Sequence, residues 1–230
     1  MEQVTPIFTF YLGSFPVNLT WDVVIQWIVI VVLGIMAHLL TRNLKRIPDK
    51  KQVILETIYN FVKNLVYENM GPEYKNYIPY VGTLVIYLIA LNFLGIIGVK
   101  TPTRTVSVTF GLALTSFVVV NGNALRKNGL LGYLKGLTQP FILMLPINIM
   151  ERIVLLISLT LRLFGNMMAA TILIDMIYKA LESIIPALPV TMIGLPIIAH
   201  GFFDLFDGTI QMLVFTMLTI INIKVTADHH

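Results

Sequence analysis

The sequence has no cysteine and few charged side chains. Among its 230 residues there is no Cys, and Asp, Glu, Lys and Arg together make up only 12%. The absence of Cys excludes disulfides, thiolate chemistry and a zinc site built on thiolates. Soluble domains carry about 25% charged residues, whereas this chain is 57% hydrophobic and has a mean hydropathy of +0.83. The composition therefore indicates a polytopic membrane protein.

Motifs of nucleotide binding and hydrolysis are also missing. No GxxxxGK[ST] phosphate-binding loop occurs, so we expect no direct nucleotide binding. A zinc hydrolase needs an HExxH-type cluster, and serine chemistry needs a Ser with a His partner. The four histidines are too scattered for either arrangement: His38, His200, His229 and His230. The sequence therefore disfavours an intramembrane enzyme, and no metal or cofactor is expected.

The hydrophobic segments predict an all-α polytopic membrane protein with a single membrane domain. We expect about five membrane-embedded helices and one amphipathic surface helix. Residues 1–20 lack Lys and Arg and are interrupted by prolines, unlike a signal peptide, so they are expected to form an external N-terminus. The surface helix has an alternative, which is packing against another domain. The predicted elements are a first span at 21–40, the surface helix at 50–70, a two-span hairpin at 77–125 and a long tilted hairpin at 146–225.

The long hairpin is expected to contain two helices that exceed the thickness of a membrane. From Pro146 the helical pattern continues to about Leu181 without a breaker. That length is on the order of 50 Å, against roughly 30 Å of hydrocarbon. Pro186 and Pro189 then break the chain, and Pro196 is expected near the start of the second helix. Helices of this length must tilt strongly or extend beyond the membrane.

The basic residues are distributed unequally between the two sides of this topology. One side holds only Lys100, Arg104 and Lys179. The positive-inside rule makes the richer side cytoplasmic, with the N-terminus outside and the C-terminus inside. Topology thus accounts for the net charge of +4, and no nucleic-acid partner is expected. The cytoplasmic set is Arg42, Lys45, Arg46, Lys50, Lys51, Lys63, Lys75, Arg126, Lys127, Lys135, Arg152 and Lys224.

A single arginine, Arg162, lies near the middle of the apolar pattern in the first helix of the long hairpin. An arginine at the bilayer centre costs roughly 2.5–3.5 kcal/mol on insertion scales, so its presence indicates a function. Ser158 lies one turn before it and Asn166 one turn after it, which places three polar groups on one stripe. Because lipid offers these groups no partner, the stripe must face protein or water. The alternative is a structural ion pair of Arg162 with Asp204 or Asp207.

A second set of polar residues is predicted toward the outer end of the hairpin. On the first helix, Thr171 and Asp175 point well away from the Arg162 face at about 100° per residue. This helix therefore has two polar faces, and the carboxylates are expected to line a wet cavity behind the arginine. Asp175 in the headgroup zone and His200 as an interfacial residue are the simpler alternatives. The second helix carries polar residues at spacings of four, three and four, which share one face: His200, Asp204, Asp207 and Gln211.

Two motifs, LRLFGNM at 161–167 and GTIQMLVFTMLT at 208–219, carry a family resemblance. Over essentially its whole length the chain resembles subunit a of bacterial F-type ATP synthases. The resemblance implies a stator subunit of F0 in the bacterial cell membrane, with a ring of c subunits, b-type peripheral-stalk subunits and the lipid bilayer as partners. It also implies that the chain is not an enzyme by itself, because the nucleotide chemistry belongs to other subunits.

The same resemblance assigns roles to several polar residues. It implies that Arg162 faces the ring and separates two offset aqueous half-channels, while Asn166 and Gln211 help to organise that contact. A fixed positive charge favours the ionised form of a ring carboxylate as it passes. No cofactor is implied besides the transported ion, which is H⁺ or Na⁺.

The sequence departs from the family pattern in the outer half-channel. Many bacterial relatives have a glutamate nine residues after the arginine, where this chain has Thr171. We hypothesise that Asp204 supplies the outer carboxylate instead, aided by Asp207 and Asp175. Because of this departure, the sequence does not identify the transported ion as H⁺ or Na⁺. The frequency of each ion in the family is the only ground that favours H⁺. The alternative function is a stand-alone secondary transporter or channel, which predicts inverted repeats or paired broken helices, and the sequence shows neither.

Overall fold

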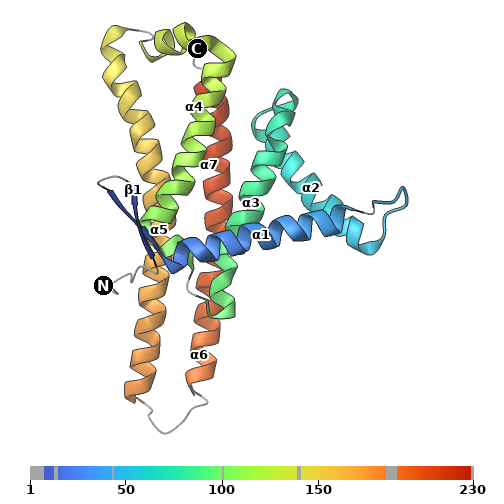
Figure 1. Ribbon diagram of the computed structural model, residues 1–230, viewed down its shortest axis with the longest axis vertical. Helices are drawn as coiled ribbons and strands as arrows, with labels where there is room; N and C mark the ends of the chain where they lie inside the picture. Colours follow the sequence, from blue (N-terminus) through green and yellow to red (C-terminus); the bar gives the residue numbers. More distant parts are fainter. Residues whose placement is uncertain are drawn as a thin grey trace.

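The computed structural model describes residues 8–12, 15–42, 44–99, 101–138, 141–184 and 191–228. Long helices run side by side along the longest axis, and α1 runs across them (Figure 1). The elements are β1 (Phe8–Leu12), β2 (Phe15–Leu19), α1 (Trp21–Thr41), α2 (Lys50–Asn69), η1 (Pro72–Tyr77), α3 (Ile78–Phe93), η2 (Leu94–Ile97), η3 (Pro102–Arg104), α4 (Val106–Leu137), η4 (Ile142–Met144), α5 (Leu145–Ile184), α6 (Thr191–His200), η5 (Gly201–Asp207) and α7 (Gly208–Asp228).

The described helices include five segments long and apolar enough to cross a membrane by length and composition. This confirms the predicted class of an all-α polytopic membrane protein. A short antiparallel hairpin, β1–β2, precedes the first of these helices and was not predicted; its register runs from Phe8↔Leu19 to Leu12↔Phe15. Pro16 fits this two-stranded ribbon because each strand has a free edge, where a missing N–H costs no ladder bond.

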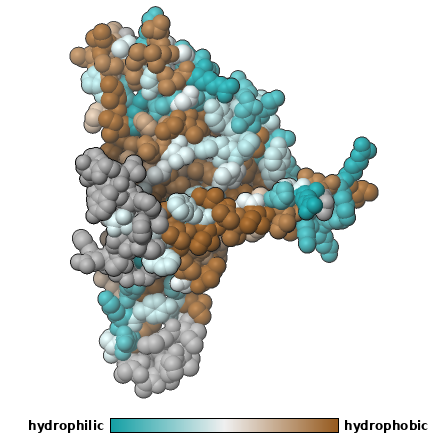
Figure 2. Space-filling view, viewed as in Figure 1, coloured by the Kyte–Doolittle hydropathy of each residue, from teal (hydrophilic) through white to brown (hydrophobic). Residues whose placement is uncertain are grey.

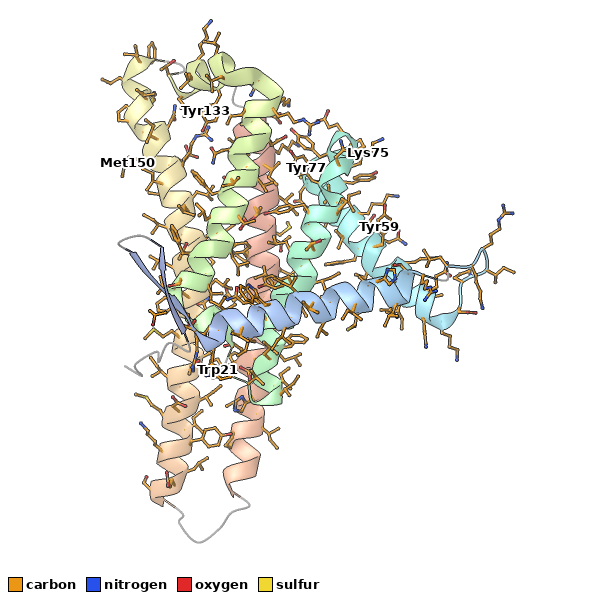
Figure 3. The ribbon with its side chains drawn as sticks, viewed as in Figure 1. Trp21, Tyr59, Lys75, Tyr77, Tyr133 and Met150 are labelled. Atoms are coloured by element: carbon orange, nitrogen blue, oxygen red, sulfur yellow. The ribbon has the colours of Figure 1, made fainter. Side chains whose placement is uncertain are left out.

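The first helix, α1, lies almost entirely outside the packed bundle. None of its 21 residues is buried, and apolar side chains such as Trp27 (59% exposed) and Leu39 (64% exposed) cover its surface. Figure 2 shows this apolar band along α1, with hydrophilic side chains gathered where the chain turns toward α2. Trp21 begins the helix beside the bundle (Figure 3). Such a surface needs lipid or another apolar helix to cover it.

The direction of α1 bears on how the long helices cross a membrane. A helix of 21 residues spans about 30 Å, close to the thickness of the hydrocarbon layer. The 40 residues of α5 extend about 60 Å. In Figure 1, α1 runs across the long axis along which α5 lies. The axes of α1 and α5 therefore cannot both be perpendicular to the membrane. If α1 stands upright, the long helices are strongly tilted.

The hydrophobic core lies between α3, α4 and α7, with one end of α2 and one face of α5 added to it. Its fully buried side chains include Val66 of α2, Leu88 of α3, Val120 of α4 and Phe215 of α7. From α5 the core takes only a narrow stripe that includes Leu163. The rest of α2 and α5 leaves apolar side chains exposed, so both helices have free faces for lipid or for other subunits.

Two helices depart from the continuous patterns that the sequence predicted. The third span was expected to end near residue 125, but α4 continues to Leu137 through a non-helical residue, Gly129, with φ +69°. Glycine tolerates this left-handed conformation because it has no Cβ. The last helix was expected to be one element, yet a π-helical turn, η5, separates α6 from α7. Pro196 lies inside α6, after its first turn.

Polar contacts fasten the C-terminal end of α7 to α4. Asn123 of α4 donates to the Ile223 carbonyl (3.0 Å) and accepts from the Tyr77 hydroxyl (2.7 Å). Lys127 Nζ lies 2.7 Å from Asp228 Oδ1. Tyr77 and Tyr133 lie toward the same end of the bundle, the end at which the chain terminates (Figures 1 and 3). These contacts fix the end of the bundle opposite the C-terminal end of α5 (Figure 1).

Candidate functional site

Arg162 is a half-buried residue of α5 without an intramolecular partner in the described part of the chain. It lies between Leu161, which is 56% exposed, and Leu163, which is 1% exposed. None of the described residues forms a hydrogen bond or ion pair with its guanidinium. Asp204 pairs with His200 instead, so the alternative of a structural ion pair with Arg162 finds no support. A guanidinium in an apolar helix needs a partner or water, so its partner must come from outside these residues.

The predicted stripe of Ser158, Arg162 and Asn166 lies on one side of α5. All three residues are half-buried. A parallel stripe that includes Leu163 and Met167 is buried in the bundle. Because neighbouring helix positions differ by about 100°, the polar stripe runs along the flank of the packed face. A group approaching this flank of α5 would meet all three polar side chains.

Gln211 begins the second turn of α7 and is nearly buried, with 6% exposure. Its amide makes no hydrogen bond to the residues described by the structure. The hydroxyl of Thr216, on the same helix, is fully buried and likewise lacks a partner there. Buried polar groups are normally hydrogen-bonded. On α7, the Gln211 amide and the Thr216 hydroxyl have no hydrogen-bond partner among the described residues.

Asp204 lies in the π-helical turn η5 and is the most deeply buried carboxylate among the described residues of α5, α6, η5 and α7. Its side chain is 9% exposed, and its Oδ2 lies 2.7 Å from Nδ1 of His200. The other ring nitrogen of His200, Nε2, lies 3.4 Å from the hydroxyl of Tyr178 on α5. The simpler expectation for His200, an interfacial residue, misses this contact. The i,i+4 spacing of His200 and Asp204 was visible in the sequence and could have predicted the pair.

Residues at the C-terminal end of α3 and in η2 contact the segment that carries Asp204. The sequence analysis did not predict these contacts. An ideal Cβ on Gly95 would lie 2.7 Å from the Asp204 carboxyl carbon and 2.8 Å from both of its oxygens. Asn92 is fully buried and donates a hydrogen bond of 2.9 Å to the carbonyl of Gly208, where α7 begins. Asn92 also accepts a hydrogen bond of 3.4 Å from Thr103. An amide inside an apolar span was the available signal for Asn92.

The structure does not gather the remaining predicted residues around Asp204. Asp207 is half-buried and Asp175 is exposed, and no hydrogen bond among the described residues joins either to Asp204. Thr171, which occupies the position of the missing glutamate, donates to the Met167 carbonyl of its own helix at 2.9 Å. Asp204 is therefore the one of the three carboxylates that the fold encloses.

A cavity of about 910 Å³ lies elsewhere, between α1, α3 and α4. Its lining includes Gln26, whose amide oxygen accepts a hydrogen bond of 3.4 Å from Tyr87. Tyr80 also lines it and lies 3.1 Å from Ser116 of α4. None of the predicted site residues lines this cavity. The hydroxyl-rich space is thus separate from the arginine stripe and from the Asp204 pair.

Comparison with known families decides the class of protein. A family described as "ATP synthase A chain" matches residues 23–224. This chain belongs to the ATP synthase subunit a family. It is 35% identical to "ATP synthase subunit a" of Moorella thermoacetica over 96% of this chain and 95% of that protein. It is 34% identical to "ATP synthase subunit a, sodium ion specific" of Propionigenium modestum over 92% of this chain and 74% of that protein.

Membership in the subunit a family confirms the prediction made from the two motifs. A third relative, "ATP synthase subunit a 2" of a Bradyrhizobium strain, is 31% identical over 96% of this chain and 94% of that protein. The chain is therefore a multi-pass membrane protein and a component of the F0 part of an ATP synthase complex.

Proposed function

We propose that this subunit is the stator of the F0 motor, and that Arg162 separates two offset half-channels through which H⁺ or Na⁺ reaches and leaves the carboxylates of a c-subunit ring. The observation that carries the proposal is the Arg162 guanidinium on a flank of α5, which has no partner among the described residues. A charge at membrane depth without a partner is costly. A ring carboxylate passing this flank supplies the missing opposite charge.

The electrostatics of such a contact suit a rotary motor. A fixed guanidinium stabilises the ionised form of a nearby carboxylate, so a ring carboxyl group gives up its ion as it passes Arg162. The same charge repels a cation that would cross directly between the half-channels. One elementary charge falling through 100 mV releases about 2.3 kcal/mol, which a direct leak would dissipate.

The exposed face of α5 beside Arg162 supports docking of the ring. Leu161, Met168 and Ile172 are 56%, 41% and 44% exposed, and Gly165 shares their face. A Cβ added to Gly165 would meet nothing within 4 Å. A glycine on an apolar helix face lets another helix approach closely. This face, which we call the Leu161–Ile172 face, therefore offers the ring a smooth apolar surface next to the charge.

For the outer half-channel we propose Asp204 as the ion-accepting carboxylate, with Asp207 and Asp175 on the path to it. Its burial in η5 supports this role, because a carboxylate enclosed by the fold is reached only by a defined route. The basic residues on the opposite side support an orientation with the N-terminus outside and the C-terminus in the cytoplasm. The α5–α6 end of the hairpin then faces the outside.

The proposed function requires other subunits. A stand-alone transporter or channel would leave Arg162 and the Leu161–Ile172 face against lipid, which offers a guanidinium no partner. We propose that the c ring covers this face, that b-type subunits of the peripheral stalk hold the chain, and that nucleotide chemistry takes place in other subunits. The outer surfaces of α1 and α2 remain for stalk subunits and for the bilayer.

Site-directed cross-linking tests the contact with the ring. Because the chain has no cysteine, single cysteines can be introduced as Leu161→Cys and Met168→Cys and labelled with a maleimide photo-cross-linker in the assembled complex. We expect products that contain the c subunit. Ile30→Cys on α1, which is similarly exposed at 54%, is the matched control and should not yield them. Equal c-subunit labelling from Ile30→Cys, or none from α5, would contradict the proposal.

A further inference from the structure

The turn between α1 and α2 projects away from the helical bundle (Figure 1). We call residues 42 and 44–51 the α1–α2 elbow, and all of them are exposed. The elbow directly follows α1, whose 21 residues are long enough to cross the hydrocarbon layer. An α1 that crosses the membrane therefore places the elbow at the level of the lipid headgroups.

The elbow carries a concentrated positive charge, and Figure 2 shows hydrophilic side chains gathered there. Residues 42–51 contain five basic residues and one acidic residue, so their net charge (5 − 1) is +4, which equals the net charge of the whole chain. The acidic residue, Asp49, is paired with Lys45 at 2.9 Å. A cluster of about four to eight basic residues next to a membrane-spanning helix is typical of a site for anionic lipids. The basic residues of the elbow that form no ion pair with any described residue are Arg42, Arg46, Lys50 and Lys51.

Hydrogen bonds from Gln52, in the first turn of α2, hold the elbow in a closed turn. Its Oε1 accepts from the backbone N–H of Lys45 and its Nε2 donates to the Lys45 carbonyl, both at 2.9 Å. The ion pair between Lys45 and Asp49 spans the same turn. The basic side chains are thus displayed by a turn of defined shape, and a site that is ordered in advance loses less entropy when it binds a ligand.

Apolar side chains are exposed beside these charges. Within the elbow, Leu44 is 60% exposed and Ile47 is 85% exposed. On α2, a stripe of exposed apolar residues at spacings of four and three continues from the elbow: Ile54, Ile58 and Phe61. Basic residues next to an apolar stripe are typical of a helix that lies at the boundary between headgroups and acyl chains. An anionic lipid offers phosphate to the basic groups and acyl chains to the apolar ones.

We propose that the α1–α2 elbow is a binding site for anionic phospholipids, whose phosphate groups are held by its unpaired basic residues. Arg42 and Arg46 suit phosphate because a guanidinium can donate two parallel hydrogen bonds to it. The site gives α1, none of whose residues is buried in the bundle, an attachment at its C-terminal end. The orientation proposed above makes this the cytoplasmic surface. Lipid binding here does not depend on the role of Arg162.

Photo-cross-linking in the intact complex tests the proposal. Ile47→Cys is labelled with a maleimide benzophenone, and the whole ATP synthase is reconstituted in vesicles of phosphatidylcholine with phosphatidylglycerol as the minor component. Mass spectrometry of the peptide that carries residue 47 identifies the attached lipid. We expect phosphatidylglycerol to exceed its mole fraction by about fivefold or more, the effect of a single basic residue near an anionic surface. Ile35→Cys, which is 55% exposed on α1, is the control and should attach to both lipids in proportion to their amounts.

Neutral variants show whether the charges carry this preference. In the Ile47→Cys background, combined Arg46→Gln, Lys50→Gln and Lys51→Gln should remove most of it. The matched control neutralises three exposed basic residues elsewhere and should keep it: Lys75→Gln, Arg126→Gln and Lys135→Gln. If the elbow variant does not assemble, high salt replaces it, because screening of exposed charges should lower the preference in the same way.

Three results would overturn the proposal. The first is attachment of both lipids to residue 47 in proportion to their amounts. The second is a preference for phosphatidylglycerol that survives neutralisation or, where the variant does not assemble, high salt. The third is a product at residue 47 that contains another protein subunit in place of lipid, which would assign the elbow to an acidic protein partner. Failure of the proposed function is recognised separately, because Arg162→Ala would then synthesise ATP normally while the lipid labelling stayed unchanged.

Discussion

The Asp204 carboxylate occupies the space in which a side chain at Gly95 would lie. The distances from an ideal Cβ on Gly95 to the carboxyl atoms are 2.7–2.8 Å, far below van der Waals contact. The two residues lie in different elements, η2 and η5, which are packed together. The place of the carboxylate therefore depends on a glycine that lies 109 positions away in the sequence (204 − 95).

Gly95→Ala is expected to displace Asp204 and slow ion-driven ATP synthesis. Overpacking of a filled interior costs about 1–3 kcal/mol, and here the nearest atoms belong to the carboxylate itself. Synthesis by the reconstituted complex measures the effect. Gly82→Ala, on the preceding helix α3, is the control because its Cβ would make an ordinary contact of 3.7 Å with Val62. Equal rates for the two variants would refute the role of Gly95.

Asn92→Ala is expected to loosen the joint between η5 and α7. The amide is fully buried and holds the Gly208 carbonyl at 2.9 Å, and loss of such a partner costs about 1–3 kcal/mol. Thermal unfolding of the detergent-solubilised complex should begin at a lower temperature. Asn64→Ala, at an exposed position of α2, is the matched control. An unchanged melting curve for Asn92→Ala would show that this hydrogen bond does not hold the joint.

Asp204→Asn is expected to slow ion-driven synthesis much more than Asp175→Asn. The first change removes an enclosed, histidine-bonded carboxylate, and the second removes an exposed one. Loss of a proton-transfer group typically reduces a rate by about 100-fold or more. Rates of ATP synthesis at a fixed gradient provide the comparison. If both variants keep the wild-type rate, Asp204 is not the outer carboxylate.

Asn123→Ala is expected to destabilise the C-terminal end of α7 more than Lys127→Met does. Asn123 bridges the Tyr77 hydroxyl and the Ile223 carbonyl, so its loss breaks two hydrogen bonds. The Lys127–Asp228 pair is 47% and 45% exposed, and exposed ion pairs contribute less than about 1 kcal/mol. Protease sensitivity of the C-terminus in the solubilised complex reports the difference. Greater sensitivity of Lys127→Met would reverse this ranking.

Much of the helical fold could be predicted from hydrophobic patterns alone. The unbroken pattern from Pro146 to about Leu181 predicted a helix that the structure places at Leu145–Ile184. The family was predicted by two short motifs and is confirmed by comparison. The division of the last helix by η5 was not predicted, because a π-helical turn changes the hydrophobic period too little to be noticed over seven residues.

The candidate site was only partly predictable. Spacing within one helix placed Ser158, Arg162 and Asn166 on one stripe, because such residues keep their relation in any α-helix. The contact between Gly95 and Asp204 joins two elements that are far apart in the sequence. Helical periodicity relates residues only within one helix, so it cannot predict this contact. The alternative of an ion pair between Arg162 and Asp204 or Asp207 finds no support among the described residues, because Asp204 is bonded to a histidine on its own helical segment.

The measurement that tests the account most directly is ATP synthesis by the reconstituted complex carrying Arg162→Ala, driven separately by a proton gradient and by a sodium gradient. Arg126→Ala, which changes an exposed arginine of α4 shortly before Gly129, is the control. We expect synthesis by the wild type and by Arg126→Ala with the proton gradient, and none by Arg162→Ala with either gradient. Normal synthesis by Arg162→Ala would contradict the claim that this arginine separates the half-channels.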